Sequence, residues 1–303
     1  MSLLVVGSVA LDTVKTPFGE VEEGLGGSAT YFATSASFFS DVKLIAVVGE
    51  DFPEAHIDFL KKRGIDLEGL TRSFGKTFPW RGEYSYQLNE AKTLKTDLNV
   101  FESFRPKLPP SYLNIPYLFL ANIDPGLQLN LLKQVKSPRL TACDTMNFWI
   151  EGSRDRLLKT LAEVDIVTIN EGEARALSGE INLIKAAKTI LSIGPKTLIV
   201  KRGEYGALMF NGKKIFSVPA YPLENVFDPT GAGDSFAGGF MGYLAEKGVM
   251  SDKVLRQAAI YGSVMASFCV ESFSLDRFRK LTEDDIQKRC SKFKDLTVYE
   301  YPT

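Results

Sequence analysis

The sequence predicts an α/β fold in which helices cover both faces of a mainly parallel sheet. Short runs rich in Val, Ile and Leu recur along the chain, and their lack of polar alternation is typical of strands buried on both faces. Helical patterns separate these runs, and this alternation implies right-handed crossovers between parallel strands. With 303 residues, 45% of them hydrophobic, the chain can form one large domain, residues 1–303, around a sizeable core.

The individual elements follow from these patterns in chain order. Strands are predicted at residues 3–7, 44–49, 117–121, 140–144, 166–170 and 198–201. Helices are predicted at residues 28–39, 53–63, 127–135, 154–163, 171–178 and 183–192. The C-terminal third is predicted to be helical, and Thr282 is the expected N-cap of the last helix.

Residues 71–101 break this rhythm. Tyr84, Tyr86 and Leu88 alternate with polar residues, and a polar turn at 89–92 precedes a second, similar segment. A period of two predicts an antiparallel hairpin with one apolar and one polar face. A second β segment is predicted around Gly19, so the sequence indicates a β lid formed by about residues 12–23 and 71–101. Such lids commonly exclude water from an active site, and a decorative or dimer-forming hairpin is the alternative.

Composition and charge exclude several classes of function. The net charge of −1 and the pI of about 6.1 give no electrostatic footprint for nucleic acid and no basic face for a membrane. The N-terminal apolar run is far below the roughly 18 residues of a membrane span, and it lacks the basic start of a signal peptide. Three cysteines without a C-x-x-C pair fit a reducing cytoplasm. His56 is the single histidine, so a multi-histidine metal site is excluded. It is expected to be a solvated residue on a helix.

Residues 227–236 read FDPTGAGDSF and stand directly before a predicted helix. The stretch is not a dinucleotide fingerprint, because Phe236 occupies the place of the third glycine. The nearest match to a Walker A loop ends at residues 212–214, has one residue too many and lies between two short predicted strands. Both familiar phosphate-binding motifs are therefore excluded.

The backbone of this stretch nevertheless predicts an anion site. Pro229 holds Asp228 extended, and Gly231 and Gly233 allow the chain to turn. The first N–H groups of the following helix have no partner within the helix, so they point at any anion bound there. Asp234, in the first helical turn, is a dipole-stabilising acid if considered alone. Beside an anion site it is a candidate general base.

At this point the chain resembles the ribokinase-like, or PfkB-type, carbohydrate kinases. Residues 228–236, DPTGAGDSF, resemble the second signature of that family, and Gly26-Gly27 resembles the first. Asn170 and Glu173 match the N-x-x-E motif, residues 200–206 resemble the nucleotide loop, and residues 144–149 loosely resemble a D-x-N-x-x-x-W region. The resemblance implies a ribokinase-like three-layer sandwich with a mainly parallel central sheet and a small β-sheet lid. It also implies an ATP-dependent kinase.

The resemblance assigns roles on the phosphoryl side of the site. Asp234 would be the general base, and the segment Gly231, Ala232 and Gly233 would form the anion hole for the moving phosphoryl group. Asn170 and Glu173 would place Mg²⁺, often through water, and a helix-capping role is the alternative for this pair.

The nucleotide side follows from the same resemblance. Lys201, Gly203 and Gly206 would contact ATP, with simple turn glycines as the alternative for the last two. Asp228 and Thr230 are candidates for a monovalent-cation site, as in some members of the family. The small side chains of residues 258–267 leave room for the adenine, or alternatively for close helix packing.

The acceptor side carries Asp12, Gly26, Gly27 and Tyr31. In the family an acid at the place of Asp12 binds sugar hydroxyls, and the two glycines allow close approach of the acceptor. Tyr31 stands where the family usually has Asn, which argues against ribose and favours another polyol or a flatter partner. Several aromatic residues offer surface for stacking on a base, with packing inside the lid as the alternative. They are Phe78, Trp80, Tyr84, Tyr86 and Trp149.

Three functions remain open from the sequence. The first is an ATP-dependent kinase for a hydroxyl of a sugar or sugar-like molecule, and the second is a nucleoside kinase of the same family. The third is a kinase-shaped binding or regulatory protein without turnover, against which the intact motifs argue. A cytoplasmic protein is expected, with no nucleic-acid or membrane partner, and the polar edge of the lid suggests a homodimer.

Overall fold

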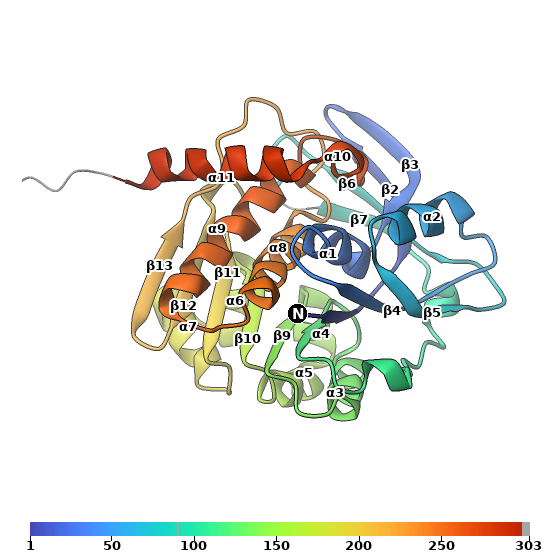
Figure 1. The fold of residues 1–303 in the computed structure, drawn as a ribbon, viewed down its shortest axis with the longest axis horizontal. Helices are drawn as coiled ribbons and strands as arrows, with labels where there is room; N and C mark the ends of the chain where they lie inside the picture. Colours follow the sequence, from blue (N-terminus) through green and yellow to red (C-terminus); the bar gives the residue numbers. More distant parts are fainter. Residues whose placement is uncertain (90, 299–303) are drawn as a thin grey trace, which may run out of the picture.

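A nine-stranded sheet forms the centre of the molecule (Figure 1), with the strand order β13-β12-β11-β10-β9-β8-β1-β4-β5. The computed structural model describes residues 1–89 and 91–298. The seven strands from β11 to β5 in this order are parallel to one another. Strand β12 is antiparallel to β11, and β13 is antiparallel to β12. The bounds are β1 Leu3–Val6, β4 Val42–Val48, β5 Asp66–Arg72, β8 Tyr117–Leu120, β9 Leu140–Asp144, β10 Ile166–Asn170, β11 Thr197–Lys201, β12 Ala207–Asn211 and β13 Lys214–Val218.

Helices cover both faces of this sheet, which confirms the predicted three layers (Figure 1). In β1, Leu3 and Val5 pack into one core and Leu4 and Val6 into the other, because successive side chains point to opposite faces. The first core includes α1 Ser28–Ala36, α2 Glu54–Lys62, α8 Ala232–Lys247, α9 Asp252–Cys269, α10 Asp276–Lys280 and α11 Glu283–Thr297. The second includes α3 Pro125–Gln134, α4 Asn147–Gly152, α5 Arg154–Leu161, α6 Glu171–Ser178 and α7 Leu183–Leu191.

A four-stranded sheet in the order β3-β2-β6-β7 forms the lid (Figure 1). Its strands are β2 Ala10–Thr16, β3 Gly19–Gly26, β6 Phe78–Tyr84 and β7 Ala91–Thr96. Strands β2 and β6 run parallel, and the outer strands pair antiparallel to them. The lid is tied to the C-terminal part of the chain, because Thr16 Oγ1 donates to the carbonyl of Phe227 at 2.9 Å. Ser274 Oγ donates to the carbonyl of Leu25 at 2.6 Å.

The hairpin of the lid differs from its prediction. Strand β6 ends at Tyr84, so Tyr86, which is 88% exposed, and Leu88, whose φ is +50°, belong to the turn. All six residues of β7 are exposed, and the predicted apolar face of the second strand is therefore wrong. Alternation marks a strand only where one face is covered, and this strand lies at the open edge of a small sheet.

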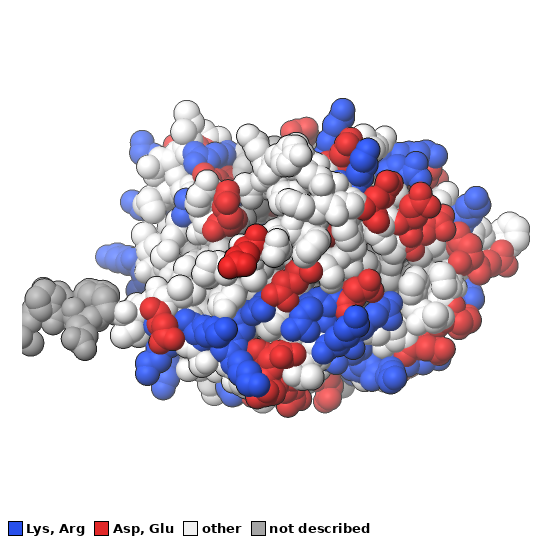
Figure 2. Space-filling model, turned by 90° about the horizontal axis from the view of Figure 1, so that it is seen from above, with Lys and Arg blue, Asp and Glu red and all other residues white. Residues whose placement is uncertain are grey.

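Surface features agree with the composition. On the face shown in Figure 2, acidic and basic side chains are interspersed, and an area without charged side chains lies near the upper middle.

His56 lies on α2 as predicted, but it is half-buried against Phe52 rather than solvated, and burial lowers its pKa. No helix within the described ranges is sufficiently long and apolar to span a membrane.

Candidate active site

The carboxyl ends of parallel strands bring the predicted site residues to one edge of the central sheet. Asp144, Asn170 and Lys201 are the last residues of β9, β10 and β11, which are neighbours in the sheet. Ligands of open α/β sheets gather at such an edge. The turn that precedes α8 approaches the same edge, because the Cα of Gly233 lies close to the Lys201 side chain.

The turn at residues 228–234 is a left-handed turn that leads directly into α8. Gly231 is the N-cap of α8 with a φ of +74°, a left-handed conformation that favours glycine. Asp228 fixes the loop, since it accepts hydrogen bonds from the N–H of Thr230 at 2.9 Å and of Ser274 at 3.2 Å. Within the described part of the chain, the N–H groups of Gly233 and Asp234 have no acceptor. The N–H of Ala232, in contrast, donates to the Pro229 carbonyl at 3.2 Å and is not free for an anion.

The carboxyl group of Asp234 stands in the first turn of α8, as predicted, and is half-buried. Burial raises its pKa above the ordinary value, and the negative charge of Asp144 raises it further, while Lys201 opposes the shift. Asp12 and Glu173 also raise it, so the four carboxyl groups share one electrostatic environment. A carboxylate whose proton affinity is raised is a better general base.

Lys201 forms a largely buried ion pair with Asp144, which begins the region that loosely resembles the D-x-N-x-x-x-W motif but had no predicted role. The Lys201 Nζ lies 3.0 Å from Asp144 Oδ2, and the two side chains are 16% and 6% exposed. Asp144 carried two signals in the sequence, its place in that motif and an acidic side chain at the carboxyl end of a predicted buried strand. Lys201 thus lies beside the anion turn as well as on the predicted nucleotide loop.

Asn170 and Glu173 form a capping box at the start of α6. Asn170 Oδ1 accepts from the Glu173 N–H at 2.8 Å, and Glu173 Oε2 accepts from the Asn170 N–H at 2.7 Å. Each side chain therefore commits one oxygen to the helix start, and the second carboxylate oxygen of Glu173 remains. Within residues 1–89 and 91–298, no three His, Cys, Asp or Glu side chains are grouped closely enough to hold a metal. The uncommitted oxygen of Glu173 would serve as one ligand of a Mg²⁺ ion that keeps most of its own waters, as Mg²⁺ usually does.

The predicted nucleotide glycines lie in a tight turn after β11. Gly203 opens the short 3₁₀ helix Gly203–Tyr205, and Gly206 has a φ of +82°. A β-carbon at Gly206 would lie 2.0 Å from the Val218 carbonyl oxygen, so this glycine is required by the chain path alone. A β-carbon at Gly203 would lie 2.3 Å from Asn89 Oδ1, which places the tip of the lid against this turn.

On the acceptor side, Asp12 and the glycine pair lie in direct contact. The Gly27 N–H donates to Asp12 Oδ2 at 3.2 Å, and a β-carbon at Gly26 would lie 1.9 Å from the same oxygen. The other oxygen, Oδ1, is buried and has no hydrogen-bond partner in the described part of the chain. Burial raises the pKa of Asp12 to about 7, opposed by the bond from Gly27. An unpaired buried carboxylate oxygen is costly and is suited to a donor from a ligand, such as a hydroxyl group.

Two tyrosines join the acceptor side to the anion turn. Tyr31 is 2% exposed, and a β-carbon at Gly231 would lie 2.3 Å from its ring. The buried ring therefore packs directly against the backbone of the turn. Tyr84, the last residue of β6, lies with its hydroxyl 3.3 Å from Thr230 Oγ1. The lid therefore contacts the turn at residues 228–234 directly, through Thr230.

The raised pKa of Asp12 predicts that the affinity for the acceptor depends on pH. Only the ionised carboxylate accepts two hydroxyl donors, so the KM of the acceptor is expected to fall as the pH rises through about 7. In Asp12→Asn this dependence is expected to vanish, and KM is expected to rise by roughly 10- to 100-fold because a charge-assisted bond is lost. Steady-state kinetics between pH 6 and 8.5 measure both effects, and a wild-type KM that stays constant over this range contradicts the assignment.

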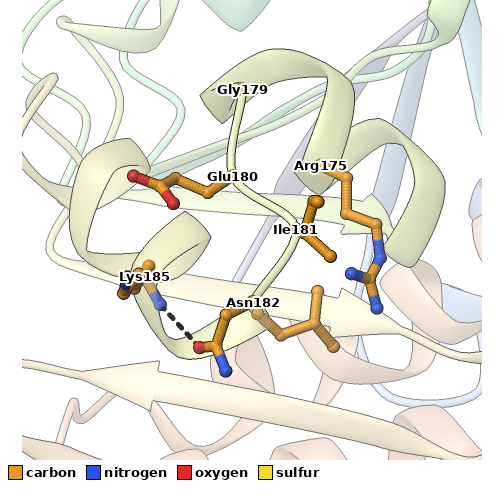
Figure 3. A pocket seen from close by; sticks show the side chains of 7 residues that line it. Arg175, Gly179, Glu180, Ile181, Asn182 and Lys185 are labelled. Carbon is orange, nitrogen blue, oxygen red and sulfur yellow. Dashed lines mark hydrogen bonds between the residues drawn. The ribbon is translucent and has the colours of Figure 1, made fainter.

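A shallow depression elsewhere does not belong to this site. It lies where α6 leads into α7 and is lined by Arg175, Gly179, Glu180, Ile181, Asn182, Leu183 and Lys185 (Figure 3). The side chain of Ile181 is 86% exposed there. None of the predicted catalytic or acceptor residues lines this depression.

Comparison with known proteins decides the family. Residues 88–279 match the family model described as pfkB family carbohydrate kinase. The chain belongs to the PfkB family of carbohydrate kinases. The resemblance drawn from the motifs is thereby confirmed, and the chain is an ATP-dependent kinase whose acceptor is a sugar or a nucleoside.

Individual relatives of this PfkB kinase agree with the assignment. It is 32% identical over 247 residues to the cytidine kinase of Thermococcus kodakarensis, which covers 80% of this chain and 87% of the relative. It is 24% identical over 231 residues to the nucleoside kinase of Methanocaldococcus jannaschii, covering 76% and 73% of the two chains. The crystal structure of a nucleoside kinase from M. jannaschii matches with a TM-score of 0.77 at 22% identity, over 96% of this chain and 98% of the other, which confirms the ribokinase-type fold.

Proposed function

We propose that this PfkB kinase is a nucleoside kinase, with cytidine as the first acceptor to test and Asp234 as the general base. The observation that supports this most directly is the pairing of an acidic and an aromatic side chain on one face of the lid. The unpaired oxygen of Asp12 suits ribose hydroxyls, and Trp80 beside it suits a base. The similarity to a cytidine kinase over most of both chains supports the same choice.

The register of the lid strands places these two side chains together. Asp12 in β2 pairs with Trp80 in the parallel strand β6, so both side chains point to the same face. Tyr84 is four residues further along β6, on that same face, and reaches Thr230, so this face points toward the anion turn. The Trp80 ring lies along the strand, since a β-carbon at Gly82 would be 2.2 Å from it. A flat aromatic surface next to a hydroxyl acceptor fits a nucleoside better than a hexose.

The proposed chemistry is an in-line transfer in which the acceptor oxygen bonds to the γ-phosphorus. The bond from that phosphorus to the bridging oxygen breaks, ADP leaves, and the hydroxyl proton passes to Asp234. The free N–H groups of Gly233 and Asp234 stabilise the charge on the transferring group. Phosphoryl transfer depends mainly on positioning and charge stabilisation, which a rigid helix start supplies.

The cation and nucleotide assignments belong to the same proposal. Mg²⁺, held near Glu173 and Asn170 through water, would neutralise charge on the phosphates. Gly203, Gly206 and Lys201 would line the nucleotide side. Asp228 and Thr230 remain the proposed place for a monovalent cation.

Assembly and compartment are further parts of this proposal. We propose a homodimer formed through the lid, whose strand β7 is an open and fully exposed edge. A cytoplasmic location is proposed because the three cysteines are free. No nucleic acid or membrane partner is proposed.

The proposed acceptor is tested by measuring ADP formation with a panel of substrates. Cytidine, inosine, adenosine, ribose, fructose and myo-inositol are compared at equal concentrations with ATP and Mg²⁺. We expect kcat/KM for at least one nucleoside to exceed that for every free sugar by roughly 100-fold, since base stacking and hydroxyl binding add. A free sugar that is used as well as the best nucleoside contradicts the proposal.

Trp80→Leu separates base recognition from sugar recognition. Loss of stacking is expected to raise KM for the nucleoside by roughly 10- to 100-fold, while kcat and the weak reaction with ribose stay within about twofold. Tyr86→Leu is the matched control, because Tyr86 is a lid aromatic that is 88% exposed and is expected to leave KM unchanged. Equal losses with nucleoside and ribose would show that Trp80 only supports the lid.

A further inference from the structure

The Lys201 side chain crosses one strand of the sheet to reach its partner. Lys201 ends β11 and Asp144 ends β9, and β10 lies between them. Adjacent strands are about 4.8 Å apart, so the side chains of Lys201 and Asp144 together bridge nearly 10 Å past the end of β10. Only a long, extended side chain can make this ion pair, whose N–O distance is 3.0 Å.

The position of the ammonium group brings it to the anion turn. A β-carbon at Gly233 would lie 2.9 Å from Lys201 Nζ, so the absence of a side chain at position 233 makes room for the ammonium group. A group bound to the free N–H groups of Gly233 and Asp234 would therefore be within reach of Lys201. The bond to Asp144 uses one of the three N–H donors of the ammonium group, and the others have no acceptor among the described residues.

The local charge balance favours a protein cation at this place. Asp144, Glu173 and Asp234 surround Lys201 electrostatically, giving three carboxyl groups against one ammonium group. A phosphoryl group entering this environment would otherwise face only repulsion from side chains. Burial alone would lower the pKa of Lys201, but Asp144, Glu173 and Asp234 together raise it, so the charge is retained.

We propose that Lys201 is a catalytic residue that contacts the transferring phosphoryl group, and that Asp144 is the positioning residue that holds it there. This inference rests on the proposed use of the turn at residues 231–234 as the phosphoryl site. Because the ammonium group is paired with Asp144, it is held at the edge of the sheet and does not form an ion pair with Asp234. The general base is thus left free to receive the proton.

Kinetics of matched variants test the inference. Lys201→Met is expected to lower kcat by roughly 100-fold, as for the loss of one donor to a developing charge, with the acceptor KM within about twofold. Lys201→Arg keeps the charge and is expected to restore at least about tenfold of that loss. Lys196→Met is the control, since Lys196 directly precedes the other end of β11 and forms an ion pair with Asp165 there, and it is expected to keep the wild-type kcat.

Double substitution identifies the role of Asp144. Asp144→Asn alone is expected to lower kcat by about tenfold, and the double variant Asp144→Asn/Lys201→Met is expected to match Lys201→Met within about twofold, because Asp144 acts through Lys201. The double variant also guards against unfolding, because it removes the buried charge that Lys201→Met leaves unpaired. If Asp144→Asn lowers kcat by the same factor in both backgrounds, the positioning role is wrong.

Nucleotide binding separates this inference from the acceptor assignment. Calorimetry with ADP and with the non-hydrolysable analogue AMP-PNP needs no acceptor. Lys201→Met is expected to weaken AMP-PNP by at least about tenfold and ADP by less than about twofold, because only the former carries a γ-phosphoryl group. Equal weakening of both ligands, or a kcat within about threefold of wild type, overturns the catalytic role. A wild-type enzyme that binds neither nucleotide would refute the kinase function itself.

Discussion

Asp234→Asn is expected to lower kcat by roughly 10³-fold while the affinity for ATP changes by less than about twofold. The amide keeps the size of the side chain but cannot accept the hydroxyl proton. Because burial and neighbouring carboxylates raise the pKa of Asp234, the acidic limb of the kcat/KM profile is expected well above the ordinary carboxylate range. The part of that limb due to Asp234 is expected to disappear in the variant, while the part that Asp12 contributes through KM remains.

The same substitution is expected to stabilise the protein. A carboxyl group whose pKa is raised in the folded state ionises at a cost, so its contribution to stability falls as the pH rises from its ordinary value to its folded value. The neutral amide removes this cost, and thermal unfolding at pH 8 is expected to shift upward by roughly 1–3 °C. A lower unfolding temperature together with lost activity would indicate that Asp234 is structural.

The matched control is another aspartate in the first turn of a helix. Asp284→Asn in α11 removes a carboxylate that is 71% exposed and paired with Lys288, far along the chain from the site. It is expected to leave kcat unchanged. A similar loss in both variants would indicate a general effect of helix-dipole acids.

Gly231→Ala is expected to lower kcat by at least about 100-fold and to cost roughly 2–4 kcal/mol of unfolding free energy. Two effects add at this position. The φ of +74° disfavours any residue with a β-carbon by about 1–2 kcal/mol. The new methyl group would also lie 2.3 Å from the ring of Tyr31, which is buried and cannot move aside easily. Relief of this contact displaces the N–H groups that follow.

Gly179→Ala isolates the first effect, the positive φ, so the difference between the two variants measures the contact with Tyr31. Gly179 ends α6 with a φ of +73°, but a β-carbon there would meet nothing within 4 Å. Its substitution is expected to cost only about 1 kcal/mol, with unchanged kcat. Urea unfolding and kinetics of the two variants give the comparison, and equal stability losses would show that contact with Tyr31 is unimportant.

The regular part of this fold was predictable because local pattern and final environment agree. Strand β1, with the sequence LLVV, is buried on both faces, so a continuous apolar run was a sufficient signal. Edge strand β5, with the sequence DLEGLTR, carries polar residues toward solvent and was not predicted. The turn was predicted at 89–92, several residues after the end of β6 at Tyr84. The reason is that Tyr86, although exposed, continues the alternation of apolar and polar residues that is typical of a strand.

The site was predictable to the extent that it depends on backbone geometry. The motif around Gly231 requires a left-handed turn before a helix, and this requirement is visible in the residue types alone. The role of Asp144 was not predicted, because it comes from an ion pair with Lys201, 57 residues later, across an intervening strand. The sequence also gave no sign that Tyr31 would support the turn at Gly231, since the two positions are joined only by packing.

The ties between the lid and the C-terminal segment have a consequence for biosynthesis. Thr16 bonds to Phe227 across 211 positions. Ser274 bonds to Leu25 across 249 positions. Contacts so distant in sequence form late, because closing a long loop costs conformational entropy before the contact can contribute any stabilising free energy. When β11 has been synthesised, Asp12 and Lys201 exist, but the turn at residues 228–234, which lies between them in the folded protein, does not. The catalytic centre can therefore assemble only after most of the chain has left the ribosome.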